Sequence, residues 1–214
     1  MNESLADIAV EVSACRRCPL GSQRTHAVPG EGPADARVLL IGEGPGFHED
    51  QQGRPFVGAS GQLLEDLLAS IGLSRRQVFI ANVIKCRPPG NRDPEPAELT
   101  ACREFLDRQI AALQPAVIVT LGRFSMERYF PGQAITRIHG RAKRLGDAFF
   151  LPLFHPAAAL RNPAWRQELT QDFRKIPELL VQLAAEKNPS PAAGAAPGDP
   201  DDGGEGYTQL SLFS

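Results

Sequence analysis

The chain has 214 residues, of which 42% are hydrophobic, so it is long enough to bury one sizeable core. Its formal net charge is −2, but four of its 25 acidic residues follow Lys187 and the preceding part is slightly basic, so the charge does not exclude a nucleic-acid partner. No segment approaches the roughly 20 apolar residues of a membrane span, and the first residues are acidic where a signal peptide would be basic, so we expect a cytoplasmic protein with no membrane partner.

Helical and strand patterns alternate along residues 1–187, which we expect to form a single domain. The elements expected in chain order are a helix over 4–12, a strand over 37–41, a helix over 61–72, a strand over 78–85, a helix over 96–113, a strand over 116–122, a short helix over 123–130, a β-rich segment over 142–154 and a helix over 164–185. Strands that alternate with helices predict a three-layer α/β/α fold around a mostly parallel central sheet.

The end of the chain differs in composition from the body. Residues 188–208 are rich in Pro, Gly, Ala and Asp, which bury too little apolar surface to offset the entropy of ordering. We expect this segment to be a flexible, disordered acidic linker. It leads to a short apolar peptide at 209–214.

The connection between the first expected strand and the following helix is long and rich in chemistry. Residues 42–64 read GEGPGFHEDQQGRPFVGASGQLL, with acids, a histidine, an aromatic ring and several glycines. Strand-to-helix connections normally take about two to six residues. Because ligands of parallel sheets bind at the carboxyl ends of the strands, this segment is a candidate wall of a binding site.

The four cysteines form a pattern that suits a metal centre. Cys15 and Cys18 make a C-x-x-C pair, and Cys86 and Cys102 follow at uneven spacing. A zinc ribbon more often has two such pairs, and four thiolates of uneven spacing suit a cubane iron–sulfur cluster at least as well. The spacing therefore leaves zinc, an iron–sulfur cluster and buried structural cysteines open.

The loop CRPPGNRDP and the residue before it carry Lys85, Arg87 and Arg92 beside prolines and a glycine. A stiff basic loop of this kind is a plausible contact to a phosphate backbone. A solvated turn explains the same residues equally well.

Three further residues each have two interpretations. Asn82 interrupts an apolar strand, where its amide either fixes a neighbouring loop or reads the edge of a ligand. Phe56 can fill a core or stack on a ligand. His155 follows an apolar strand, a position where a histidine is more often a core residue than a catalytic one.

From CRRCPL to HPAAALRNP the sequence resembles the family 4 uracil-DNA glycosylases, the iron–sulfur branch of the uracil-DNA glycosylase superfamily. The motifs that carry the resemblance are GEGPG followed by ED, GRPFVG and SGQLL, then NVIKCRPPGNRDP, LGR and HPAAALR. The resemblance implies a uracil-DNA glycosylase-like fold and a monofunctional enzyme that hydrolyses the N-glycosidic bond of uracil in single- and double-stranded DNA during base-excision repair. It also implies a 4Fe-4S cluster rather than zinc, with Cys15, Cys18, Cys86 and Cys102 as its ligands.

The resemblance also makes the long connection one wall of a uracil pocket. Phe56 would stack on a base flipped out of the duplex, and Asn82 would pair with the uracil edge. Glu49 would crowd the C5 side of the base against thymine. His155 would donate to uracil O2, and Glu43 lies in the catalytic motif.

Gly42 and Gly44 would let the backbone approach the base closely. Gly44 stands where better-known branches carry an aspartate that handles the water, so Glu43, the backbone or no specific group would position that water. The residues expected to contact DNA are Arg87, Arg92, Leu160 and Arg161, of which Leu160 or Arg161 would push into the duplex.

The peptide QLSLF at 209–213 resembles the peptide by which bacterial repair and replication proteins bind the sliding clamp, the β subunit of the replicative polymerase. An extended peptide with a glutamine and apolar anchors can fill a preformed pocket, while a flexible linker lets the enzyme reach DNA. The alternative is an apolar end that folds back on the domain. The residues expected to contact the clamp are Gln209, Leu210, Leu212 and Phe213.

Two other functions compete with the enzyme. A clamp-tethered sensor would keep the pocket and bind uracil-DNA with little turnover, but the presence of Glu43, Asn82 and His155 favours catalysis. A zinc-dependent hydrolase needs an open coordination position, which a site closed by four cysteines does not offer. We expect a monomer.

Overall fold

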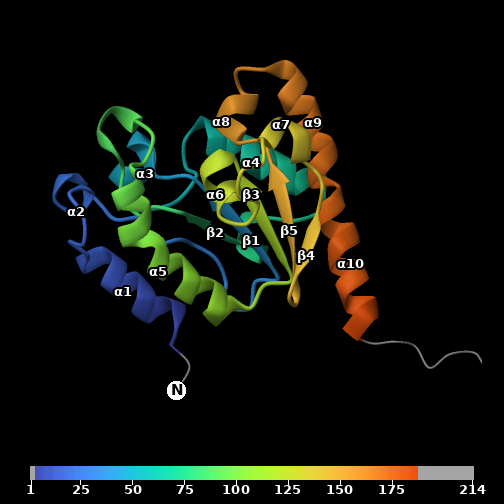
Figure 1. Ribbon diagram of the computed structural model, residues 1–214, viewed down its shortest axis with the longest axis horizontal. Coiled ribbons are helices and arrows are strands. Elements are labelled where there is room, and N and C mark those ends of the chain that lie inside the picture. The colour runs from blue at the N-terminus through green and yellow to red at the C-terminus, as the bar shows by residue number, and fades with distance from the viewer. Residues whose placement is uncertain (1–2, 188–214) are drawn as a thin grey trace, which may run out of the picture.

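The computed structural model describes residues 3–187, and the linker and tail peptide expected over 188–208 and 209–214 lie outside these residues. Its centre is a five-stranded sheet in the order β2-β1-β3-β5-β4 (Figure 1). Strands β2, β1, β3 and β5 run parallel, and β4 at the edge is antiparallel to β5. The mostly parallel sheet of the expected α/β fold is therefore confirmed. The strands are β1 (Val38–Gly42), β2 (Phe79–Asn82), β3 (Val117–Leu121), β4 (Lys143–Leu145) and β5 (Ala148–Leu153).

Two inner strands, β1 and β3, are apolar except for Thr120. Strands β1 and β3 read VLLIG and VIVTL, and every residue in both is buried. Continuous apolar runs of this kind occur where helices cover both faces of a parallel sheet. The register sets Ile41 beside Ala81 and Gly42 beside Asn82, so β1 and β2 end at the same level.

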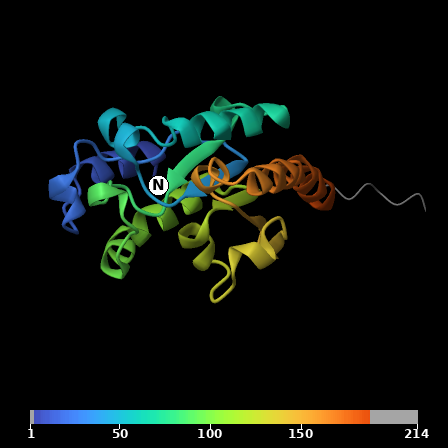
Figure 2. The same ribbon diagram turned by 90° about the horizontal axis from the view of Figure 1, so that it is seen from above.

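Helices cover the sheet on both faces and complete three layers (Figure 2). No helix in the described part of the chain is long and apolar enough to span a bilayer. The helices on one face are α4 (Ala59–Ser70), α9 (Pro163–Phe173) and α10 (Lys175–Lys187). The helices on the other face are α5 (Pro96–Leu113), α6 (Arg123–Glu127) and α7 (Ile135–Ile138).

The N-terminal helix packs against α5 at one end of the sheet. It begins after Ser4, whose hydroxyl accepts the Asp7 N–H while the Asp7 carboxylate accepts the Ser4 N–H. Its buried Ile8 and Val12 form a third apolar cluster with Phe105 of α5. This N-terminal helix is α1 (Leu5–Ala14). Two short helices follow it in the chain, α2 (Leu20–Gln23) and α3 (Phe47–Gln52).

Three elements differ from the sequence expectations. The single helix expected over 164–185 is divided into α9 and α10, because the Pro177 ring would clash with the carbonyl of Phe173 in a continuous helix. The strand expected over 78–85 ends at Asn82, whose carbonyl accepts a hydrogen bond from the Lys85 ammonium at 2.9 Å. The long connection after β1 contains the short helix α3, which the sequence pattern did not indicate.

Candidate functional site

A cavity of about 400 Å³ opens at the edge of the sheet where the parallel strands end. Its walls come from the segments that follow β1, β2 and β5 and from the loop around η2 (Pro89–Asn91). Ligands of open parallel sheets bind at this edge. The sequence-predicted residues in its walls are Glu43, Gly44, Glu49, Phe56, Asn82, Arg92, His155 and Arg161.

Asn82 brings a buried amide to the cavity. It is the last residue of β2, its exposed fraction is 2%, and within residues 3–187 its Oδ1 has no hydrogen-bond partner. A buried polar atom without a partner costs roughly 1–3 kcal/mol, so this amide suits a ligand that completes its hydrogen bonds. Gly42 makes the arrangement possible, because a Cβ there would overlap Asn82 Oδ1 and lie 2.7 Å from the Phe56 ring.

Phe56 forms a flat apolar wall with a strained backbone. Its φ is 52°, in the left-handed region that residues with a Cβ rarely adopt, at a cost of roughly 1–3 kcal/mol. The ring stacks on the His155 imidazole, with centroids 5.7 Å apart and planes inclined by 24°. Strain of this kind persists only where the surrounding contacts fix the residue. The ring orientation is therefore set by neighbours rather than by the preference of Phe56 itself.

Glu49 fixes the long connection from within. Its carboxylate is buried, and Oε1 accepts the backbone N–H groups of Val57 at 2.9 Å and Gly58 at 3.0 Å. Its Oε2 accepts the Gly46 N–H at 3.1 Å. These bonds join the segment before α3 to the segment that leads into α4. The acid that the resemblance assigns to the C5 side of a base thus also determines the shape of the loop.

Glu43 follows the end of β1 and is partly buried in the cavity wall. The pKa of its carboxyl is raised to about 6, chiefly by burial and also by the Asp93 carboxylate, while Arg123 opposes the rise. Arg123 and Asp93 form an ion pair with each other. A carboxyl whose pKa lies close to neutrality can accept and release a proton at physiological pH.

His155 presents a neutral imidazole to the cavity. It caps the start of α8 (Pro156–Ala159), and its Nδ1 accepts the Ala157 backbone N–H at 3.1 Å. Burial lowers the pKa of the imidazole to about 4, while the Glu49 carboxylate acts in the opposite direction. Since an N–H group can only donate, Nδ1 carries a lone pair and the ring proton lies on Nε2. The Nε2–H group is the donor that this ring offers to a ligand.

The residues expected to contact DNA differ in their availability. Arg161 lines the cavity, and Leu160 beside it is 46% exposed. Arg92 also lines the cavity, but its guanidinium donates to both carboxylate oxygens of Glu98, at 2.9 and 2.7 Å. This bidentate pair neutralises much of its charge and orders the loop. Arg87 belongs to the same loop but not to the cavity lining.

Lys85 does not reach the surface of the basic loop. Its side chain is 1% exposed, and Nζ donates to the Asn82 carbonyl at 2.9 Å and to Gln109 Oε1 at 2.7 Å. Burial lowers the pKa of the ammonium to about 8. Neither interpretation of the basic loop, a phosphate contact or a solvated turn, therefore holds for Lys85, because the residue is buried and fixes the backbone at the end of β2.

The four cysteines gather in the apolar cluster between α1 and α5. Cys86 and Cys102 are buried in this cluster, and Cys15 and Cys18, which are partly buried, pack against it. Burial raises the pKa of both buried thiols, that of Cys102 to about 11. Arg24 Nη1 donates to Cys86 Sγ at 2.9 Å, and a backbone N–H donates to Cys102 Sγ at 3.4 Å.

This donor set bears on the kind of group that could bind. Among residues 3–187, no three His, Cys, Asp or Glu side chains are arranged to hold a single metal ion. Four thiols lie in or against one apolar cluster, and N–H groups donate to the sulfurs of Cys86 and Cys102. Four such thiols fit the ligand set of an iron–sulfur cluster, whose sulfurs also accept hydrogen bonds.

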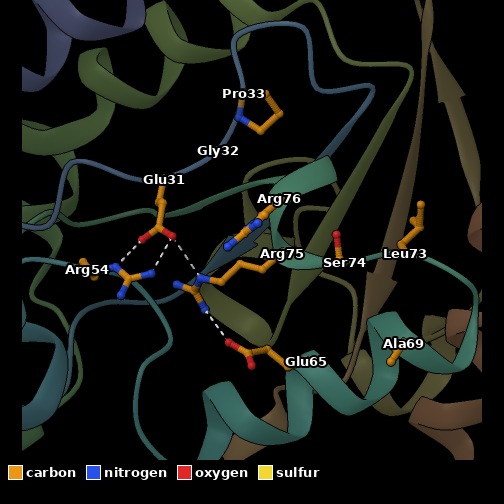
Figure 3. A pocket seen from close by; sticks show the side chains of 10 residues that line it. All are labelled: Glu31, Gly32, Pro33, Arg54, Glu65, Ala69, Leu73, Ser74, Arg75 and Arg76. Atoms are coloured by element: carbon orange, nitrogen blue, oxygen red, sulfur yellow. Dashed lines mark hydrogen bonds and ion pairs between the residues drawn. The ribbon is translucent and has the colours of Figure 1, made fainter.

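A larger cavity, of about 720 Å³, lies near the amino-terminal end of β2 (Figure 3). Its walls include η1 (Arg75–Gln77) and residues of α4. Four of its five charged side chains bind one another: Glu31 pairs with Arg54 at 2.7 Å and with Arg75 at 3.2 Å, and Arg75 also approaches Glu65 at 3.4 Å. Because most of these charges are already paired, and because the smaller cavity lies at the carboxyl ends of the strands, we assign the functional site to the smaller cavity.

Sequence reasoning missed several contributors to the smaller cavity. Asn91 lines it with a left-handed backbone at φ 56°, which the turn-forming sequence PPGN could have indicated. Asp93 acts on the pKa of Glu43 across the space between two loops, and no local pattern reveals such a distance. Gly58 donates its N–H to Glu49, which depends on the closure of the long connection.

A family model and several curated relatives indicate one family. The model described as the uracil DNA glycosylase superfamily matches residues 29–176. The type-4 uracil-DNA glycosylase of Sulfurisphaera tokodaii is 48% identical over 189 residues, covering 84% of this chain and 86% of the relative. Proteins of the same name from Archaeoglobus fulgidus and Thermotoga maritima are each 46% identical, and cover 83% and 81% of this chain and 94% and 93% of their own lengths. The chain therefore belongs to the type-4 uracil-DNA glycosylase family.

Proposed function

We propose that the chain removes uracil from DNA by hydrolysing its N-glycosidic bond, which leaves an abasic site for base-excision repair, and that the 400 Å³ cavity receives the flipped uracil. The observation that carries the assignment is the buried Asn82 amide, whose Oδ1 has no partner within residues 3–187. Uracil presents an N3–H donor and an O4 acceptor on one edge, and a single amide pairs with both. Cytosine presents the opposite arrangement on that edge.

Entry of the base into the cavity requires its removal from the stack. Unstacking and unpairing cost a few kcal/mol, which the pocket must offset. Phe56 stacks on the uracil face, and the Asn82 amide pairs with its edge. Leu160, 46% exposed next to the cavity-lining Arg161, fills the space that the base leaves in the duplex.

The chemical step separates uracil from deoxyribose. The bond between C1′ and uracil N1 breaks, its electron pair leaves with uracil, and negative charge develops on O2. The His155 Nε2–H donates to this oxygen, and a preorganised donor in a water-poor site stabilises developing charge more than bulk water does. A water forms the new bond to C1′ and loses a proton, which the Glu43 carboxylate accepts.

Glu49 limits the substrate at C5. Thymine carries a methyl group where uracil carries hydrogen. The Glu49 carboxylate lines the cavity and is held by three backbone N–H groups, so it cannot move aside without breaking those bonds. Rejection of thymine then follows from the rigidity of the loop as well as from the size of the pocket.

The four cysteines bind a 4Fe-4S cluster in this proposal. The thiols of one apolar cluster and the N–H donors to their sulfurs support it. When bound, the group supplies iron–sulfur bonds that join the turn after α1, the segment after β2 and helix α5. The ligands are Cys15, Cys18, Cys86 and Cys102.

A sliding-clamp partner is proposed on sequence alone, because residues 209–213 lie outside the described residues. The peptide QLSLF offers a glutamine and three apolar side chains, which is the form of peptide that a preformed groove recognises. Tethering by residues 188–208 would raise the local concentration of the enzyme at DNA that carries the clamp.

Replacing Asn82 by alanine is expected to lower kcat/KM for uracil-DNA by about a hundredfold or more, because a site built to hydrogen-bond its substrate loses both bonds. The assay is excision from a labelled single-stranded oligonucleotide. Thr120→Val is the matched control, since Thr120 Oγ1 is also buried without a partner in the described residues but belongs to β3 outside the cavity lining. If Asn82→Ala excised uracil as fast as Thr120→Val, Asn82 would have no role in binding uracil.

The rate of excision is expected to rise as pH increases through about 6, where Glu43 loses its proton, because only the carboxylate accepts a proton from water. His155, with a pKa of about 4, stays neutral over this range. Glu43→Gln should lower single-turnover rates by about a hundredfold or more and abolish the rise. If the rate of Glu43→Gln still rose with pH through about 6, a group other than Glu43 would be responsible for the pH dependence.

Replacing Cys86 by alanine is expected to reduce the iron and acid-labile sulfide content of the purified protein, because one ligand of the proposed cluster is lost. Val10→Ala, at a position 71% exposed on α1, is the control for handling and purification. If Cys86→Ala carries as much iron and sulfide as the control, Cys86 is not a ligand.

Deleting residues 208–214 is expected to abolish binding to a purified bacterial sliding clamp, measured by surface plasmon resonance. Excision from short oligonucleotides without the clamp should stay at the level of the full chain, because the cavity lies within residues 43–161. Clamp affinity that survives the deletion would rule out this peptide as the contact.

A further inference from the structure

Two backbone carbonyls that flank the Cα of Phe56 bind one arginine. Arg75 Nη1 donates to the Phe56 carbonyl at 2.8 Å, and Nη2 donates to the Pro55 carbonyl. The Arg75 side chain is 12% exposed. Because the guanidinium is planar and rigid, its two donors fix the relative orientation of both carbonyls. Fixing the peptide planes on either side of a Cα fixes its φ and ψ.

Arg75 is itself anchored to β2. Its Nε donates to Glu31 Oε1 at 3.2 Å (Figure 3). The Glu31 backbone pairs with Ile80 in both directions, with N···O distances of 2.9 and 2.8 Å. Ile80 precedes Asn82 by two residues in β2. The strand that ends in the cavity amide therefore also holds the anchor of Arg75.

Helix α4 also packs closely against the Phe56 carbonyl. A Cβ at Gly61, in the first turn of this helix, would overlap that carbonyl. The carbonyl therefore contacts both the helix backbone and the Arg75 guanidinium. Phe56 and His155 both line the cavity, and the Phe56 ring stacks on the His155 imidazole.

We propose that Arg75 is a positioning residue for uracil excision, which holds Phe56 in the left-handed conformation that turns its ring to the cavity. The inference rests on the proposed function, in which Phe56 stacks on uracil. Without the guanidinium, both carbonyls lose a donor and Phe56 relaxes toward the negative φ that residues with a Cβ prefer. Arg75 lies in the wall of the other cavity and acts on the substrate only through Phe56.

Arg54 provides a matched control for the charge network. Its Nε and Nη2 donate to the two Glu31 carboxylate oxygens at 2.7 and 2.8 Å, and it lines the same cavity as Arg75. Among the hydrogen bonds of the described residues it makes none to the Phe56 or Pro55 carbonyl. Arg54→Gln therefore removes one positive charge from the network and leaves the two carbonyls bound.

The test compares Arg75→Gln, Arg75→Lys and Arg54→Gln in the full chain with its cofactor. Arg75→Gln is expected to lower kcat/KM for uracil-DNA by roughly ten- to a hundredfold, because displacement of a substrate-positioning group commonly costs that much. Arg75→Lys, whose ammonium lacks the planar fork, should be intermediate. Arg54→Gln should keep wild-type activity. The thermal unfolding midpoints of all three variants are measured first, and excision rates are then measured at a temperature well below the lowest midpoint.

A double-mutant cycle with Phe56→Ala separates positioning from a general loss of stability. If Arg75 acts through Phe56, Arg75→Gln should have no further effect on kcat/KM once the ring is absent. The inference would be overturned if the losses of kcat/KM from Arg75→Gln and Phe56→Ala were additive in the double variant. It would also be overturned if Phe56→Ala lowered kcat/KM while Arg75→Gln and Arg54→Gln were equally active. Full activity of Phe56→Ala itself would instead overturn the proposed role of Phe56 in stacking. Arg75→Lys supplies the same comparison if Arg75→Gln does not fold.

Discussion

The absence of a side chain at the end of β1 is the constraint on which the site depends. Gly42 lies beside Asn82 in the register of the parallel strands, and a Cβ at Gly42 would meet both the Asn82 amide and the Phe56 ring. The register therefore sets how closely the Asn82 amide and the Phe56 ring approach each other. In the proposed site a planar base needs both at once, the amide at its edge and the ring at its face, and a side chain at position 42 would separate the two.

Burial tunes the two titratable groups of the site in opposite directions. It raises the pKa of Glu43 to about 6 and lowers that of His155 to about 4, since a poorly solvated site disfavours either charged form. Near neutral pH the pair consists of a carboxylate and a neutral imidazole. This combination gives one proton acceptor and one N–H donor, which are the two groups that hydrolysis with an anionic leaving group requires.

The sequence predicts the parts of this protein that depend on local pattern. Apolar runs identify β1 and β3, and the motifs place Phe56, Asn82 and His155 at one edge of the sheet. Properties that depend on tertiary contacts could not be read from it. Arg92 forms an ion pair with Glu98, the φ of Phe56 is positive, and Lys85 is buried. Two missed features did have local signals: Pro177 divides the helix that the periodicity of 164–185 had indicated as continuous, and the turn-forming sequence PPGN precedes the left-handed turn at Asn91.

The cavity and the cysteine cluster share one short segment of backbone. Lys85 donates its backbone N–H to Cys102 Sγ at 3.4 Å and its Nζ to the Asn82 carbonyl at 2.9 Å, and Cys86 is the next residue. Whatever holds the cysteines in place therefore also fixes the position of the Asn82 amide. A cofactor with a purely structural role would still affect excision through this segment, so a loss of activity on cofactor removal is no evidence of redox chemistry. The backbone from Asn82 to Cys86 is the physical link between the cavity and the cysteines.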